Sequence, residues 1–352
     1  MRELQVKDIL FGAAYYPEYM PYDRLQEDIA MMQKAGMNTI RIAESTWSTL
    51  EPAEGVYDFS YIDKALAAAE EAGMYVIIGT PTYAIPSWLE KKCPEVMVFD
   101  GYSRKKYGKR QIMDIVHPVF RKCAENVICK LLEHTANVSC VIGFQIDNET
   151  KHYGTASPQV QRMFVEYLKT KFHTTEQLNE VFGLRYWSNS ISDWSDFPDM
   201  AGCIHGGLAC EFAKFQRSLA AEYLVWQSEL VKKYKRQDQF ITHNFDFEWK
   251  KFGADIAQDG YSYGVQPDIN HYEASKAVTI AGTDIYHPTQ DGLTGAEIGF
   301  GGDSIRTLKD DAYIVLECQA QAFKYWTPYP GQLRLHGYSH LASGAAGALY
   351  WN

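Results

Sequence analysis

Apolar residues along the chain follow two alternating patterns. Short continuous apolar runs, of the length of a buried strand, alternate with longer stretches whose apolar residues recur at helical spacing. The strand-like runs end near Tyr15-Tyr16, Arg41-Ile42, Gly79-Thr80, Gln145-Ile146-Asp147, Thr242-His243-Asn244, Asp284-Ile285-Tyr286, Leu316-Glu317 and Tyr350-Trp351. A strand followed by a helix, repeated eight times, predicts an α/β protein with a (β/α)8 TIM barrel.

Three of the intervening stretches show the helical pattern most clearly: Tyr22 to Gly36, Ile62 to Gly73, and Phe120 to Leu132. The first two stretches end on glycine, which commonly terminates a helix. We therefore expect these three segments to be helices on the outside of the barrel.

Two features depart from a regular barrel. Roughly ninety residues separate the fourth predicted strand from the fifth, and this connection contains the aromatic and polar segment 186–194, so we expect a folded insertion at about 173–212 beside the site. The sequence stops at Asn352, directly after the eighth predicted strand. The expectation is a single barrel domain over 1–352 that lacks its final helix and exposes apolar surface there unless another segment or subunit covers it.

Composition narrows the class of protein. With 46% hydrophobic residues, a chain of 352 residues can bury the core of one large barrel. A formal charge of −10 and the lack of a lysine or arginine stripe argue against a nucleic-acid partner. The N-terminal residues form no apolar signal core, and no apolar run is long enough to span a bilayer, so we expect a cytoplasmic protein without a membrane partner.

The seven cysteines are odd in number and scattered, with no C-x-x-C pair, which indicates reduced thiols and no zinc site. Cys318 follows Glu317 directly and could be a nucleophile, but no histidine is evidently tied to it and a packed thiol is the better interpretation. We therefore expect neither a metal nor a cofactor.

Two glutamates stand at the ends of buried strand-like runs. Glu149 follows Gln145-Ile146-Asp147-Asn148, and Glu317 follows Val315-Leu316. In a parallel barrel the C-terminal ends of the strands carry the active site. Two carboxyl groups there indicate glycoside cleavage, with one as proton donor and the other as nucleophile. The alternative for either glutamate alone is a solvated charge at a strand end.

Several dispersed segments resemble glycoside hydrolase family 42, the β-galactosidases, and they occur in that family's order. They are Phe11 to Glu18, Arg41 to Glu44 with Trp47, Leu50 to Pro52 with Gly55, Tyr57 to Phe59, Gly79 to Thr82, Pro86 to Leu89, Gly143 to Glu149 and Pro330 to Leu335. The Asn-Glu pair recurs across related barrel glycosidases, whereas the opening and the Pro-Gly-Gln segment are more specific to the family.

The resemblance implies a retaining hydrolase with Glu149 as acid/base and Glu317 as nucleophile. It implies that Asn148 hydrogen-bonds the 2-hydroxyl of the sugar, although a turn residue is the alternative. Arg110 falls where the family has a substrate-contacting arginine, with a solvated surface arginine as the alternative. Arg41 could keep Glu317 ionised through a charge-assisted hydrogen bond, or serve only as an ion pair of the barrel interior.

Aromatic residues complete the implied sugar site. Tyr286 and Trp326 match the family's aromatic contacts to galactose, because the C–H faces of sugars stack on aromatic rings. Trp351 is a further candidate, for which packing is nearly as good an explanation. The segment Asp246, Glu248 and Trp249 is interpreted mainly as loop and rim.

The sequence also departs from the family. Some members carry a four-cysteine zinc site, but Asp114 stands at its first position and 151–157 contains no cysteine, so structural zinc is not expected. The family is often trimeric, which makes a homo-oligomer one expectation, yet its trimer-forming and smaller C-terminal β domains lie outside this sequence. The leading function is release of terminal β-D-galactose from small oligosaccharides or glycans. A shifted specificity for α-L-arabinopyranosides and a truncated, non-catalytic galactoside-binding barrel are the alternatives.

Overall fold

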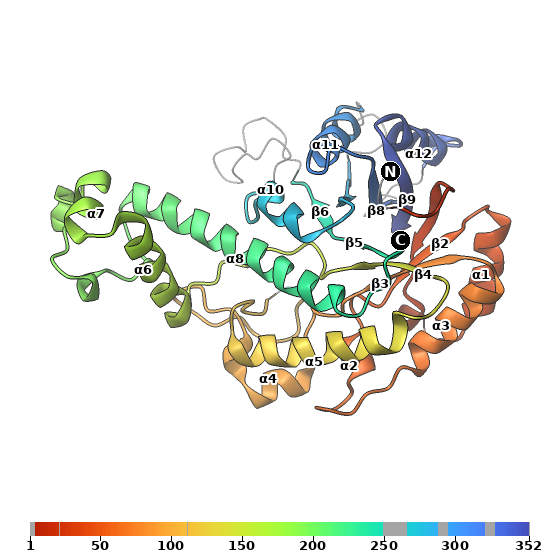
Figure 1. Cartoon of the computed structure of the whole chain (residues 1–352), viewed down its shortest axis with the longest axis horizontal. Helices are drawn as coiled ribbons and strands as arrows, with labels where there is room; N and C mark the ends of the chain where they lie inside the picture. Colours follow the sequence, from red (N-terminus) through yellow and green to blue (C-terminus); the bar gives the residue numbers. More distant parts are fainter. Residues whose placement is uncertain are drawn as a thin grey trace.

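The strands form one parallel sheet that curves into a barrel (Figure 1). The computed structural model describes residues 4–20, 22–110, 112–248, 266–287, 295–320 and 328–351. The sheet has the order β5-β4-β3-β2-β1-β9-β8-β7-β6. The strands are β1 Leu10–Ala14, β2 Thr39–Ile42, β3 Tyr75–Gly79, β4 Val141–Gln145, β5 Phe240–Thr242, β6 Asn244–Asp246, β7 Gly282–Asp284, β8 Tyr313–Gln319 and β9 Ala345–Trp351.

The two edges of this sheet belong to one short segment of chain. Strands β5 and β6 flank His243, and β5 pairs with β4 whereas β6 pairs with β7. The segment 240–246 therefore acts as one barrel strand that changes partner at His243, and it joins the two edges. The predicted (β/α)8 barrel is confirmed, with its fifth strand divided in two.

Helices surround the barrel and connect its strands. Because parallel strands need a crossover connection, most strands are followed by a helix that packs on the outer face. The helices are α1 Leu25–Lys34, α2 Trp47–Leu50, α3 Ser60–Glu71, α4 Ser87–Lys92, α5 Pro118–Thr135, α6 Pro158–Phe172, α7 Thr175–Phe182, α8 Gly206–Lys232, α10 His271–Ala274, α11 Ala296–Thr307 and α12 Gln332–Ala342. No helix within the described ranges is long and apolar enough to cross a bilayer.

The three helices predicted from apolar spacing are present as α1, α3 and α5. Gly36 and Gly73 follow α1 and α3 with positive φ values of 79° and 66°, a conformation that glycine adopts without steric strain. The helix boundaries differ from the prediction by two or three residues. The residue at which a helix begins or ends depends on local contacts that the spacing of apolar residues does not reveal.

The long connection between β4 and β5 is helical. It contains α6, α7 and α8, and Figure 1 shows α6, α7 and the first part of α8 extending away from the barrel. Aromatic side chains pack between these helices: the ring centroid of Phe164 lies 5.0 Å from that of Phe212 and 5.4 Å from that of Phe215. The segment predicted as a folded insertion, 173–212, includes α7 and ends inside α8.

A β-bulge occurs on β8 beside the site. Thr283 pairs with Val315, but the next residue, Asp284, pairs with Glu317, so Leu316 is an extra residue on β8. A bulge interrupts the strict alternation of side chains between the two faces of a strand. Leu316 packs in the apolar cluster with Leu10 and Ile77, and Glu317 still reaches polar partners inside the barrel.

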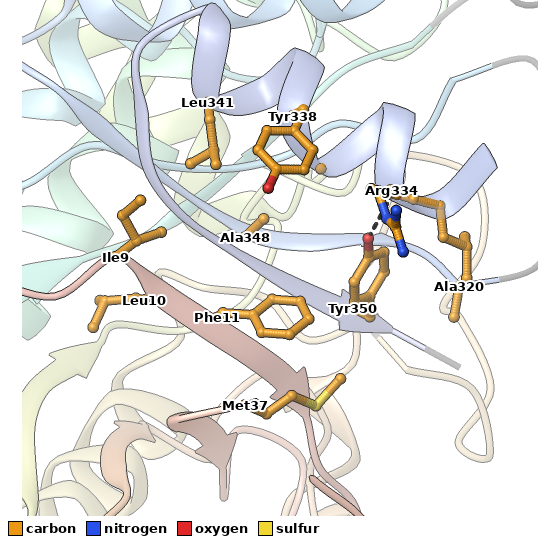
Figure 2. Close-up of a pocket in the computed structure, with 12 residues that line it drawn as sticks. Ile9, Leu10, Phe11, Met37, Ala320, Arg334, Tyr338, Leu341, Ala348 and Tyr350 are labelled. Atoms are coloured by element: carbon orange, nitrogen blue, oxygen red, sulfur yellow. Dashed lines mark hydrogen bonds between the residues drawn. The ribbon is translucent and has the colours of Figure 1, made fainter. Parts of the chain in front are cut away.

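An apolar groove of about 560 Å³ lies on the outer surface, next to β1, β9 and α12 (Figure 2). Phe11 and Tyr350 meet edge to face in it, with ring centroids 6.2 Å apart. The hydroxyl of Tyr350 donates a 3.0 Å hydrogen bond to the carbonyl of Leu333 on α12, which is the dashed line in Figure 2. This groove is separate from the polar cluster inside the barrel.

Candidate active site

Polar side chains gather inside the barrel at the C-terminal ends of its strands. Glu317 lies on β8 with 6% of its surface exposed, and Glu149, which is half-buried, follows β4. Tyr286 follows β7, and Arg41 lies on β2. Because all the strands are parallel, these four residues come from distant parts of the sequence to one end of the barrel.

Arg41 connects the polar cluster. Its side chain is fully buried and donates hydrogen bonds to Gln145 Oε1 (2.8 Å) and to the hydroxyl of Tyr16 (2.9 Å). It also forms ion pairs with Glu44 (3.2 Å) and with Glu317. Burial by itself would lower the pKa of Arg41, but the neighbouring negative groups raise it well above its ordinary value. Arg41 is thus a permanent buried cation beside Glu317.

The two carboxylate oxygens of Glu317 have different partners. Arg41 binds Oε1, and the hydroxyl of Tyr286 donates a 2.5 Å hydrogen bond to Oε2. Burial, followed by the charge of Glu317, raises the pKa of Tyr286 well above its ordinary value, so this residue remains a phenol that can donate. The ring of Tyr286 meets that of Trp351 edge to face, with centroids 6.2 Å apart.

The segment that carries Glu149 has a strained backbone. Asp147 and Glu149 have φ values of 47° and 42°, a left-handed region that side chains with a Cβ seldom adopt. Two residues of the divided fifth strand hold this segment. The N–H of Glu149 donates to Asn244 Oδ1 (3.0 Å), and His243 Nδ1 donates to the carbonyl of Ile146 (2.7 Å).

His243 also accepts, through Nε2, a 3.4 Å hydrogen bond from the N–H of Thr150. Both contacts require the neutral imidazole with its proton on Nδ1. Burial lowers the pKa of His243 to about 3, so the ring is neutral over the ordinary pH range. The strained backbone is therefore kept in place by a fixed tautomer.

Burial and the charges around Glu149 together favour its protonated form. Burial is the largest cause, followed by the negative charges of Asp246 and Glu317, and together they raise the pKa of Glu149 to about 7. Lys151 and Arg110 oppose the shift. Lys151 pairs with Asp246 at 2.8 Å, so one charge that raises the pKa of Glu149 lies beside one that lowers it. Glu149 can therefore hold a proton near neutral pH.

Asn148 is held between two amides. Its Oδ1 accepts from Gln145 Nε2 (3.2 Å) and from Asn244 Nδ2 (2.7 Å). The same Nδ2 donates to Asp284 Oδ2 (2.6 Å). Burial, and next the charges of Glu317 and Glu149, raise the pKa of Asp284 well above its ordinary value. The carbonyl end of the Asn148 side chain is consequently directed into the protein.

The remaining predicted residues have varied positions. Arg110 is exposed; its Nη1 donates to the hydroxyl of Tyr83 (3.4 Å), and its guanidinium lies 5.7 Å from the centre of that ring. Burial would lower the pKa of Arg110, but Tyr83 and the charges of Glu149 and Glu317 raise it overall, which places Arg110 within electrostatic reach of both glutamates. Trp326 and Trp249 lie outside the described residues.

Two interpretations of nearby residues can be compared with the structure. Asp246 is not a rim residue: it ends β6, is buried, and pairs with Lys151 next to Glu149. Cys318 is a packed thiol, as predicted. It is buried with Sγ directed at the carbonyl of Leu349 (3.5 Å), and burial raises its pKa, which disfavours a reactive thiolate.

Sequence reasoning missed several members of this cluster. They are Tyr16, Glu44, Gln145, Lys151, Asn244 and Asp284. The available signal was a polar residue within or directly after an apolar strand-like run, because such a residue in a barrel faces the polar interior near the site.

A (β/α)8 barrel with two carboxyl groups at the C-terminal ends of β4 and β8 is the arrangement typical of barrel glycosidases. The family model described as beta-galactosidase, that of glycoside hydrolase family 42, matches residues 14–352. The chain therefore belongs to glycoside hydrolase family 42.

Individual relatives agree with this assignment. The chain is 29% identical to the β-galactosidase BgaA of a Thermus species, a match that covers 97% of this chain and 54% of that protein. A catalytic mutant of Gan42B, a GH42 β-galactosidase from G. stearothermophilus, superimposes with a TM-score of 0.88 and 25% identity over 99% of this chain and 51% of that one. The catalytic domain of a β-amylase from Paenibacillus polymyxa shares the fold, with a TM-score of 0.71 at 12% identity. The chain spans about half the length of the β-galactosidases that it matches.

Proposed function

We propose that this chain is the catalytic barrel of a retaining β-galactosidase, with Glu149 as acid/base and Glu317 as nucleophile. One observation carries the proposal: the two carboxyl groups lie in different environments. Glu317 is bound by a buried arginine and a tyrosine hydroxyl, whereas the pKa of Glu149 is raised to about 7. A pair of carboxyl groups whose environments differ in this way can divide the roles of nucleophile and acid.

The reaction proceeds in two displacements. Glu317 attacks the anomeric carbon while Glu149 transfers its proton to the departing glycosidic oxygen, which leaves a galactosyl ester on Glu317. Glu149, now ionised, takes a proton from water as that water attacks the anomeric carbon. The galactosyl–oxygen bond to Glu317 breaks, and both carboxyl groups return to their starting states.

Arg41 and Tyr286 support the nucleophile in this scheme. In the resting state they neutralise and hydrogen-bond the carboxylate of Glu317. After the ester forms, Glu317 carries no charge, and the buried arginine is still compensated by Glu44. Arg41 therefore stabilises the leaving carboxylate in the second displacement, when negative charge returns to Glu317.

Other residues bind the sugar. Asn148 is proposed to contact the 2-hydroxyl, a hydrogen bond that strengthens as the anomeric carbon becomes cationic. Arg110 reaches the site from the segment before α5, and the rings of Tyr286 and Trp351 provide aromatic surface for the C–H faces of galactose. Trp326 is proposed as a further aromatic contact. β-D-Galactosides are the substrate that the names of the relatives support. Cytoplasmic residence and homo-oligomer formation remain predictions from the sequence.

Hydrolysis of an aryl β-D-galactopyranoside tests the proposal, with the α-L-arabinopyranoside and the β-glucoside measured in parallel. Glu149→Gln and Glu317→Gln should each lower kcat by at least about a thousandfold without unfolding the chain. Glu273→Gln, an exposed glutamate on α10, is the matched control and should retain full activity. A fully active Glu317→Gln variant would refute the assignment.

The two roles can be separated with leaving groups of different acidity. A dinitrophenolate leaves without a proton, so Glu149→Gln should form the galactosyl ester from a dinitrophenyl galactoside at nearly the wild-type rate, whereas Glu317→Gln should not. NMR of the first-formed sugar should show the β-anomer of galactose. Initial release of the α-anomer would contradict a retaining mechanism.

A further inference from the structure

One loop at the active-site end of the barrel is strongly basic, although the chain as a whole is acidic. This basic loop, residues 97–110, contains five lysine or arginine residues and one aspartate, in a sequence with a formal charge of −10. Two exposed tyrosines, Tyr102 and Tyr107, lie among the basic residues. The loop belongs to the connection from β3 to α5, and connections that follow the strands of a β/α barrel line its active-site end.

Two of the basic side chains hold the loop in shape. Arg104 donates to two backbone carbonyls of the preceding turn (3.0 and 3.1 Å), and Lys105 pairs with Asp100 (2.7 Å). Lys106 and Lys109 are exposed, and neither pairs with an acidic side chain in the part of the chain that the structure describes. Their two positive charges can therefore act on a ligand.

The basic loop is attached to the segment that follows Glu149. The N–H of Ala156 donates a 2.8 Å hydrogen bond to the carbonyl of Phe99. Arg110, the last residue of the loop, lies within electrostatic reach of Glu149 and Glu317. In the proposed reaction Glu149 protonates the departing oxygen, so the aglycone leaves on the side of Glu149. The basic loop therefore borders the aglycone side of the site.

We propose that Lys106 and Lys109 form an aglycone subsite that favours β-galactosides whose leaving group carries an anion, either the carboxylate of a uronic acid or a sulfate ester. The inference rests on the proposed function. Two ammonium groups at the entrance attract an anion that the acidic chain would otherwise repel. Tyr102 and Tyr107 provide aromatic faces on which the ring of an aglycone sugar can stack.

Three aryl β-D-galactopyranosides measure this preference: the 4-carboxyphenyl, the 4-sulfonatophenyl and the neutral 4-carbamoylphenyl galactoside. The readout is the kcat/KM of each anionic substrate divided by that of the neutral one. Differences in leaving-group acidity cancel when this ratio is compared between enzymes. Lys106→Met combined with Lys109→Met should lower the ratio by about 3–10-fold, and the corresponding double change to glutamate should lower it further. Raising the salt concentration from about 20 mM to about 500 mM should lower the wild-type ratio, because salt screens exposed charges.

Lys232→Met combined with Lys233→Met is the matched control. These two exposed lysines lie at the C-terminal end of α8, which leads into β5 and therefore ends at the opposite end of the barrel. The control removes the same amount of charge, and its ratio should equal that of the wild type.

The outcomes separate the subsite from the proposed function. A ratio that is unchanged for both anions in the Lys106 and Lys109 variants, or that falls equally in the control, would overturn the subsite. A larger fall for the carboxylate identifies a uronic acid as the aglycone, and a larger fall for the sulfonate identifies a sulfated sugar. A wild-type chain that cleaves none of the three galactosides would instead refute the proposed function, and the subsite with it.

Discussion

Arg41 and Glu317 form an ion pair across the barrel interior, although β1 and β9 lie between the strands that carry them. The guanidinium is fully buried and also pairs with Glu44. Two buried carboxylates thus depend on one cation. Removing one partner from a buried ion pair leaves an uncompensated charge and is strongly destabilising.

Arg41→Met should therefore lower the free energy of unfolding by about 3–5 kcal/mol and abolish galactoside hydrolysis. Urea denaturation at pH 7 measures the first effect. Arg306→Met is the matched control, because Arg306 pairs with Asp303 at the surface and the pair contributes little. Equal stabilities of the two variants would contradict a buried pair at Arg41.

The pH dependence of kcat/KM should follow the protonation of Glu149. Glu149 must carry a proton to protonate the leaving group, so kcat/KM should fall as the pH rises through about 7. Asp246→Asn removes a charge that raises this pKa and should move the alkaline limb to lower pH. Lys151→Met removes an opposing charge and should move it to higher pH.

Shifts of opposite sign in these two variants provide an internal control. General damage to the site would move the alkaline limb in the same direction in both variants, or would not move it in either. Each shift should be on the order of half a pH unit to one unit. Initial rates on the aryl galactoside between pH 4 and pH 10 would measure them. An alkaline limb unchanged in both variants would exclude Glu149 as the titrating acid.

Asn148→Ala should affect substrates according to their 2-hydroxyl. If Asn148 hydrogen-bonds this group in the transition state, the variant should lose roughly 10–1000-fold in kcat/KM on the galactoside and much less on the 2-deoxygalactoside. The kcat/KM for the galactoside, divided by that for the 2-deoxygalactoside, should therefore be smaller in the variant than in the wild type. Equal losses on both substrates would place the contact of Asn148 elsewhere.

Three buried histidines should make the chain sensitive to acid. The rings of His287 and His336 lie 4.5 Å apart, and His340 is 6.1 Å from His287. Burial, followed by the neighbouring histidines, lowers the pKa of His340 to about 3, below the value of about 6.5 in an unfolded chain. The unfolded state therefore binds more protons in acid than the folded state does. The contribution of the neutral His340 to the free energy of unfolding is complete above about pH 6.5 and is lost as the pH falls toward the folded-state pKa.

In acid, the free energy of unfolding of His340→Leu should fall less steeply than that of the wild type. The difference should be about 1.4 kcal/mol for each pH unit below about 6. Urea denaturation at pH 7.5, 5.5 and 4.5 measures the slope. His173→Asn is the control at an exposed histidine, chosen because asparagine tolerates the positive φ of 61° at this position. A slope unchanged by His340→Leu would show that its ring is protonated in the folded state.

The sequence was sufficient to predict the barrel because strand–helix repetition depends on local apolar spacing. It also pointed to Glu149 and Glu317, since each stands at or shortly after the end of a strand-like run. Asn244 and Asp246 could not be recognised in this way: their importance depends on the change of strand partner at His243, which is a pairing between distant segments. Glu317 shows the same limit, because its orientation depends on the bulge at Leu316.

The pairing of β1 with β9 has a consequence for how the chain acquires its fold. Leu10 pairs with Gly347, so the barrel cannot close until almost all of the 352 residues have been made. At about 5–20 residues per second, the ribosome takes on the order of tens of seconds to produce β9 after β1. During this time β1 has a free edge that can pair with other chains. Closure should therefore be a late and slow step, during which the edge of the nascent N-terminal strand needs protection from other chains.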